Sequence, residues 1–254
     1  MSTTRPRLRL WGPQLLAVAV ILSLYYISQW LTDVVRFRGL LPLNSDLRTV
    51  QWVVAIDHHF VQLCFALGCI WYLSGGDWRS WGLNTKNLGE SKRLLTRGFF
   101  PVLVLFLFFG ELLVPLLTDT PPEFGYEVTV VNVIGILVFM GIVSGLSEEI
   151  LFRGFIQTYL TQYFDRTFTV FGHVLPLSGL IAAVIFTVAH VGFTVFPLGI
   201  YHLQIPQLAL AFVLGIYYAI AYYETESLVA PIVAHNVVNG AIMIATLLAS
   251  GILT

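Results

Sequence analysis

Long apolar stretches without charged residues alternate along the chain with short polar connections. A membrane-spanning helix needs about 20 apolar residues to cross a hydrocarbon core of about 30 Å. Seven stretches approach this length, with an eighth as the alternative count: 15–31, 50–73, 98–117, 128–160, 177–196, 205–223 and 228–248. The pattern therefore predicts an all-α polytopic membrane helix bundle.

The composition supports a lipid environment. Hydrophobic residues make up 57% of the 254 residues and charged residues 11%, against roughly 25% charged residues in a soluble domain. The formal net charge of −1 gives no basic field for nucleic acid. We therefore expect an integral membrane protein that contacts the lipid bilayer and has no nucleic-acid partner.

The distribution of Lys and Arg predicts the orientation, because cytoplasmic loops hold an excess of both. Basic residues gather in the amino-terminal tail, in the connection before the third stretch and near the fourth connection: Arg5, Arg7, Arg9, Arg79, Lys86, Lys92, Arg93, Arg97, Arg153 and Arg166. We expect a cytoplasmic amino end, in the cell (inner or plasma) membrane if the source is bacterial.

The chain shows no boundary between domains, since its longest polar connection, 74–96, is short and contains apolar residues of its own. We therefore expect a single membrane domain across 1–254. The stretch 128–160 is about 50 Å long as a helix, which exceeds the membrane core. It predicts either a tilted helix or a bend at Gly141, Ser144 and Gly145, with the span centred near Glu148.

Charged residues inside a membrane helix indicate function, because a charge at the helix centre costs roughly 2.5–3.5 kcal/mol on insertion scales. Glu148, Glu149 and Arg153 interrupt the fourth stretch. On a helix, Glu149 and Arg153 lie four residues apart on one face and can neutralise each other. Glu148 is rotated by about 100° from Glu149, so it is available to face another group.

Two further polar pairs lie in apolar stretches. Phe186 and His190 are four residues apart, as are His235 and Asn239, so each pair shares a helical face. Together with a glutamate, imidazoles are groups that activate water and stabilise an oxyanion. A structural role is the alternative, because polar side chains also join membrane helices. Asn236 points away from the His235 and Asn239 face and is excluded from the predicted site.

The remaining titratable residues of interest are expected near helix ends or at the membrane interface. Asp57, His58 and His59 are expected near a helix end. His173 and His202 lie close to loop prolines in the sequence and are expected at the interface.

The three motifs, in this order, resemble those of the CAAX prenyl protease 2 and bacterial abortive-infection family, the intramembrane glutamic endopeptidases abbreviated CPBP. The family's motifs are two glutamates, three intervening residues and an arginine; phenylalanine with histidine four residues on; and histidine with asparagine or a similar residue four residues on. The corresponding residues here are Glu148, Glu149 and Arg153; Phe186 and His190; and His235 and Asn239. The resemblance covers roughly 80–250 and leaves two amino-terminal spans, within 1–75, outside it.

The resemblance implies a helical membrane endopeptidase whose polar cavity is open to the cytosol and the bilayer. In such a site, Glu148 and His190 activate the attacking water, and His235 and Asn239 hold the developing oxyanion. Three residues support the site: Glu149, Arg153 and Phe186. The implied substrate is a CAAX-type prenylated protein tail or a related membrane peptide, and no cofactor is implied.

Three alternatives stay open. Two carboxylates and two histidines could bind a divalent metal such as zinc, although the chain lacks the His-Glu-x-x-His arrangement of a zinc protease helix. The protein could instead be a non-catalytic membrane scaffold or a bacteriocin self-immunity protein, with a membrane-protein partner. A transporter with Glu148 as a proton site is disfavoured, because no internal repeat is visible.

Overall fold

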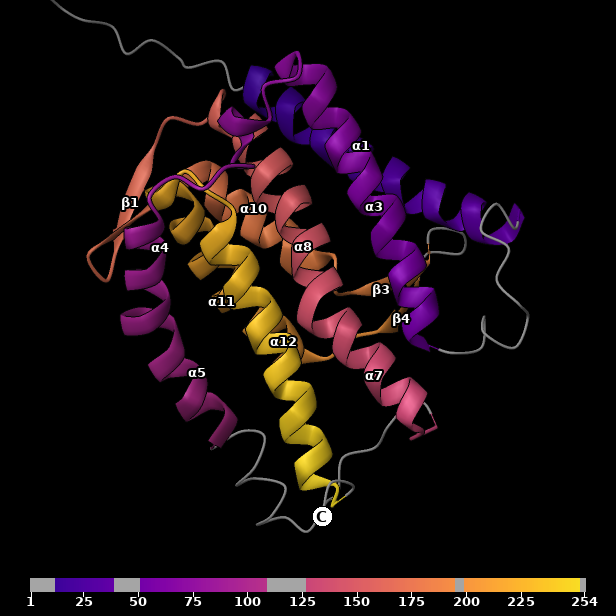
Figure 1. Ribbon diagram of the computed structural model, residues 1–254. Helices are drawn as coiled ribbons and strands as arrows, with labels where there is room; N and C mark the ends of the chain where they lie inside the picture. Colours follow the sequence, from indigo (N-terminus) through magenta and orange to yellow (C-terminus); the bar gives the residue numbers. More distant parts are fainter. Residues whose placement is uncertain (1–11, 39–50, 109–126, 195–198, 252–254) are drawn as a thin grey trace, which may run out of the picture.

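The computed structural model describes residues 12–38, 51–108, 127–194 and 199–251. These residues form an all-α helix bundle with two short β-hairpins (Figure 1). Five helices are long and apolar enough to cross a membrane: Gly12–Thr32, Trp52–Ser74, Val130–Thr161, Ile205–Thr225 and Val229–Ala249. They confirm the first, second, fourth, sixth and seventh predicted stretches, and the protein is an integral membrane protein.

The amino-terminal helices form one flank of the bundle. Helices α1 (Gly12–Arg38) and α3 (Gln51–Ser74) pack side by side (Figure 1). The chain then forms a 3-10 turn, η1 (Trp78–Trp81), and a helical run of α4 (Leu88–Arg93), the π-helical η2 (Leu94–Phe99) and α5 (Phe100–Phe106). The predicted third stretch, 98–117, begins in this run, and its part from 109 onward lies outside the described residues.

The central helix runs without interruption from Val130 to Thr161. The hydroxyl of Thr129 caps its start by accepting from the backbone N–H of Asn132. Five segments follow one another: α7 (Val130–Val138), the π-helical η4 (Phe139–Val143), α8 (Ser144–Glu149), the π-helical η5 (Ile150–Gln157) and α9 (Thr158–Thr161). Glu148 lies near the middle of this helix, as expected, and Gly141 lies in a π-helical segment.

The predicted fifth span, 177–196, is wrong in its extent. Helix α10 (Leu177–Val188) has 12 residues, about 18 Å at 1.5 Å per residue, which is too short to cross the membrane core alone. Its apolar continuation forms a hairpin of β3 (Gly192–Thr194) and β4 (Gly199–His202). Another hairpin, β1 (Thr167–Val170) and β2 (His173–Pro176), precedes α10.

Helices α11 (Ile205–Thr225) and α12 (Val229–Ala249) complete the bundle, with α12 beside α8 (Figure 1). Small residues allow α10 and α11 to approach closely, as is common between membrane helices. A Cβ on Gly215 would lie 3.2 Å from the Cβ of Ala183, and one on Gly179 would lie 3.0 Å from that of Ala219.

A glycine turn ties the segment after α3 to the connection between α11 and α12. Gly82 has φ +84°, a left-handed conformation that glycine adopts at little cost. Its carbonyl accepts a 3.0 Å hydrogen bond from the N–H of Leu228. A Cβ at this position would clash with the ring of Tyr222, so the turn requires glycine for both conformation and space.

Candidate functional site

The two adjacent glutamates lie at the end of α8, between the π-helical segments η4 and η5. Pi-helical turns are rare and are frequently found at functional sites. The helix turns the two carboxylates in different directions, as the 100° rotation per residue predicts. Glu149 faces the protein interior with 0% of its side chain exposed, whereas the side chain of Glu148 is 14% exposed.

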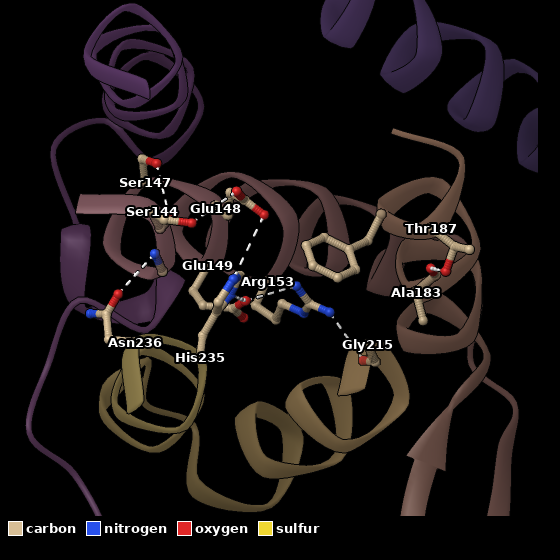
Figure 2. A network of polar contacts seen from close by, with 12 residues as sticks. Ser144, Ser147, Glu148, Glu149, Arg153, Ala183, Thr187, Gly215, His235 and Asn236 are labelled. Atoms are coloured by element: carbon tan, nitrogen blue, oxygen red, sulfur yellow. Dashed lines mark hydrogen bonds and ion pairs between the residues drawn. The ribbon is translucent and has the colours of Figure 1, made fainter. Parts of the chain in front are cut away.

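Glu149 is neutralised within the bundle. Its Oε1 accepts from Nη1 of Arg153 at 3.0 Å, which confirms the pair that the four-residue spacing predicts. The same oxygen accepts from Nδ1 of His235 at 2.7 Å. Arg153 also donates to the carbonyl of Gly215 at 3.1 Å (Figure 2), and its guanidinium lies 4.6 Å from the ring centroid of Phe186. Arg153 and Glu149 are thus a buried ion pair with several supporting contacts.

Glu148 faces a different set of partners. Its Oε1 lies 2.9 Å from Nε2 of His59 and accepts from the hydroxyl of Ser144 at 3.2 Å. Its Oε2 lies 3.9 Å from Nε2 of His235 (Figure 2), which is beyond hydrogen-bonding distance. Glu148 is therefore not paired with Arg153, as the spacing predicts, and one of its oxygens is held while the other is directed toward His235.

The position of His59 corrects the expectation that it lies near a helix end. It lies eight residues after the first residue of α3, about 12 Å along the helix, where it reaches Glu148 across 89 residues of sequence. A titratable residue inside an apolar stretch is itself a functional signal, and that signal could have identified His59. The choice of Glu148 as its partner depends on how α3 packs against α8.

His235 lies 2.7 Å from Glu149 and 3.9 Å from Glu148, and Asn239 reaches the same helix through Ser144. The side chain of Asn239 donates to the hydroxyl of Ser144 at 3.2 Å, so Ser144 links Asn239 to Glu148. Asn236 points elsewhere, and its Oδ1 accepts from the backbone N–H of Gly145 at 2.9 Å (Figure 2). Asn236 thus joins α12 to α8, consistent with its exclusion from the predicted site.

Phe186 lies between the histidines. Its ring centroid is 4.7 Å from that of His190 and 5.8 Å from that of His235. His190 lies just after the end of α10, and its Nδ1 bonds to the carbonyl of Phe186 at 2.8 Å. In the described part of the chain, no hydrogen bond or ion pair joins the side chains of His190 and Glu148. The structure thus brings the motifs together, with His190 farther from Glu148 than His235 is.

Tyr218 is a further site residue that the sequence motifs do not reveal. Its ring stacks on His235 with centroids 5.1 Å apart and an angle of 10°. It also lies 5.1 Å from the guanidinium of Arg153. The stacked ring of Tyr218 restricts the orientation of the His235 imidazole, which lies between the two glutamates.

The predicted metal alternative finds no ready ligand set. Across residues 12–38, 51–108, 127–194 and 199–251, no group of three or more His, Cys, Asp or Glu side chains is arranged to hold a metal ion. A separate cavity of about 770 Å³ lies against η1, η5 and α11, lined in part by Arg79, Lys86, Gln157, Tyr222 and Glu226. None of the predicted site residues lines that cavity.

The fold and the site define a class: a polytopic membrane helix bundle with two adjacent glutamates and several histidines gathered between its helices. Residues 130–241 match the family model described as Type II CAAX prenyl endopeptidase Rce1-like. This segment contains all seven residues of the three motifs and confirms the resemblance of the chain to the CPBP family. No curated protein and no solved structure gives a significant match.

Proposed function

We propose that the protein is an intramembrane endopeptidase in which Glu148 activates a water molecule to hydrolyse a peptide bond. The contrast between the two glutamates carries this proposal. Glu149 is fully buried and bonded to Arg153, so its negative charge is neutralised by the guanidinium. Glu148 is partly exposed and its Oε2 has His235 as its nearest partner at 3.9 Å, which leaves that oxygen able to accept a proton.

In the proposed step, the water oxygen bonds to the scissile carbonyl carbon as Oε2 of Glu148 takes one water proton. The carbonyl π electrons move to oxygen and form the oxyanion. When this intermediate collapses, the C–N bond breaks and the proton passes from Glu148 to the leaving amine. His190 supports the water, because its Nδ1 bonds to the Phe186 carbonyl, which leaves Nε2 as an acceptor in the neutral ring.

The oxyanion would be held by His235 and Asn239. Asn239 uses one N–H on Ser144 and has a second to donate. The Nδ1 of His235 donates to Glu149, so His235 donates from Nε2 only when both of its ring nitrogens carry a proton. We expect Glu148→Ala to abolish turnover and Asn239→Ala to leave a trace, since losing one oxyanion donor costs about 10²- to 10³-fold in rate.

The proposed substrate is the carboxyl-terminal tail of a prenylated CAAX protein or a related membrane peptide. The family model and the position of Glu148 near the middle of a membrane-spanning helix support this substrate class. The proposed orientation places the amino end in the cytoplasm, on the side that the Lys and Arg distribution indicates.

The experiment compares amino- and carboxyl-terminal peptides of the host membrane proteome in cells carrying the native protein or Glu148→Gln. This neutral change is close in shape and removes the base. Glu226→Gln is the matched control, because Glu226 is 68% exposed in a pair with Lys86. We expect uncut precursors only with Glu148→Gln. An unchanged peptide map, with the variant folded and any phenotype complemented, would favour the scaffold or immunity alternative.

A chelator tests the metal alternative on the same substrate. We expect full activity after dialysis against the chelator, because the proposed step uses only side chains and water. Loss of activity that returns only when a divalent metal is added would require a metal-based mechanism.

A further inference from the structure

The groups around Glu148 come from both amino-terminal and motif-bearing helices. Among the described residues, the charged and titratable groups that interact with Glu148 are Tyr25 of α1, His59 of α3, His190 after α10, Tyr218 of α11, His235 of α12 and Arg153 of its own helix. Within the described residues, His59 is the titratable group that makes a hydrogen bond to Glu148. It lies outside the segment 130–241 that matches the family model.

The hydrogen bonds of His59 locate a proton. Its Nδ1 lies 2.8 Å from the carbonyl oxygen of Ala55, which can only accept, so Nδ1 donates. Its Nε2 lies 2.9 Å from Oε1 of Glu148. A neutral imidazole that donates from Nδ1 has only a lone pair on Nε2, so this contact requires one further proton, on Nε2 or on Oε1.

The surroundings of Oε1 favour the proton on His59. Ser144 accepts from Asn239 at 3.2 Å and directs its own hydroxyl proton to Oε1 of Glu148 at 3.2 Å. An oxygen that receives two donors is typical of an ionised carboxylate. The side chain of His59 is 13% exposed and that of Glu148 14%, so little water competes with a charge-assisted bond between them.

We propose that His59 is a positioning residue for Glu148: as an imidazolium anchored to the Ala55 carbonyl, it holds Oε1 and leaves Oε2 directed toward the reaction. This rests on the proposed function for its catalytic consequence. The second membrane helix then contributes to the site, because α3 supplies the group that orients the base.

Two substitutions at His59 test the contacts of its two ring nitrogens separately. In His59→Asn, the amide nitrogen can occupy the place of Nδ1 and keep the Ala55 contact, while the contact to Glu148 is lost. In His59→Gln, the longer side chain can donate to Glu148 but cannot carry the proton. The control is His202→Gln, the same chemical change at an exposed histidine of β4 that bonds to Gln207.

The catalytic test uses the purified full-length protein in lipid nanodiscs and a fluorogenic farnesylated CAAX peptide. We expect His59→Asn to lower kcat by about 10- to 100-fold, the effect of misplacing a reacting group by about 1 Å, with KM within about twofold. His59→Gln should recover part of the rate. In both variants the acidic limb of the pH–rate profile should move to higher pH, because the imidazolium that favours ionised Glu148 is gone.

His202→Gln should match the native protein in rate and profile. Native kcat with an unmoved profile in His59→Asn overturns the proposal. The proposal is also overturned if His59→Asn lowers kcat by the same factor at every pH and has a lower melting temperature, because that pattern indicates a structural role.

A second measurement is independent of activity. Nitrogen-15 NMR of histidine-labelled protein near pH 7 should show both ring nitrogens of His59 protonated, identified by the resonances lost in His59→Asn. In Glu148→Gln, Nε2 should become unprotonated, since the glutamine amide can donate to it. An unprotonated Nε2 in the native protein overturns the proposal. If the NMR result is as expected but the native protein cleaves no peptide, the proposed function is wrong, while the assignment of an imidazolium at His59 bonded to Glu148 is retained.

Discussion

Replacing Arg153 by methionine removes the positive charge from the most buried ion pair of the site. Both side chains of the Arg153 and Glu149 pair are 0% exposed. Methionine keeps much of the length and apolar volume of the arginine stem. The change therefore isolates the charge and its hydrogen bonds from the packing.

The expected cost follows from what remains after the change. Arg153→Met deletes the 3.0 Å contact with Glu149 and the 3.1 Å bond to the Gly215 carbonyl. Glu149 is then a buried carboxylate with His235 as its remaining partner at 2.7 Å. Breaking a buried pair from one side costs about 3–5 kcal/mol, and we expect a loss of about 4 kcal/mol in the free energy of unfolding.

The double variant Glu149→Gln with Arg153→Met tests the reason for that loss. Glutamine removes the uncompensated charge and can still accept from Nδ1 of His235. Removing one member of a buried pair is costly because the other charge stays uncompensated. The double variant keeps neither charge, so it should recover about 2–3 kcal/mol relative to Arg153→Met, within the range of measured pair couplings.

The assay is equilibrium unfolding of the purified protein in mixed micelles, followed by tryptophan fluorescence. Arg93→Met is the matched control, since Arg93 pairs with Glu90 three residues earlier on the exposed surface of α4. Exposed pairs contribute little to stability, so the control should be close to the native protein. The reasoning is refuted if Arg153→Met is no less stable than Arg93→Met.

Three further predictions concern packing and charge elsewhere. Gly145→Ala should destabilise the contact between α8 and α12, since its Cβ would clash with the Asn236 side chain; differential scanning calorimetry should show a lower melting temperature than for Gly141→Ala, where a Cβ meets open space. Gly82→Ala should cost about 1–3 kcal/mol from its left-handed conformation alone, measured by the same unfolding assay. The hydrogen bond from Arg93 lowers the pKa of Glu90 from its usual value. The pair's small contribution to stability is therefore present above about pH 4.3, the pKa of an unperturbed glutamate, and is lost as the pH falls through the lowered pKa. NMR titration should show the Glu90 midpoint rising in Arg93→Met.

The sequence predicts those features of the fold that depend on local pattern. Apolar length identifies the five long helices, because crossing the membrane core requires about 20 residues. The pair of Glu149 and Arg153 is predictable because both residues lie on one face of one helix. The relation of Glu148 to Glu149 follows from the same rotation.

The features that the sequence does not predict depend on packing between distant segments. Apolar character continues past Val188, but it reports a lipid or core environment and does not distinguish the end of α10 from the hairpin that follows. The contact of His59 with Glu148 spans 89 residues and depends on how α3 turns toward α8. The stacking of Tyr218 on His235 likewise requires α11 and α12 to be in place.

The central claim is that Glu148 is the base that activates water. The most direct measurement is the initial rate of cleavage of a farnesylated CAAX peptide by purified native protein, Glu148→Gln and Glu226→Gln, each shown to be folded by its unfolding transition. We expect cleavage by the native protein and Glu226→Gln, and no detectable cleavage by Glu148→Gln. Near-native cleavage by folded Glu148→Gln would contradict the assignment.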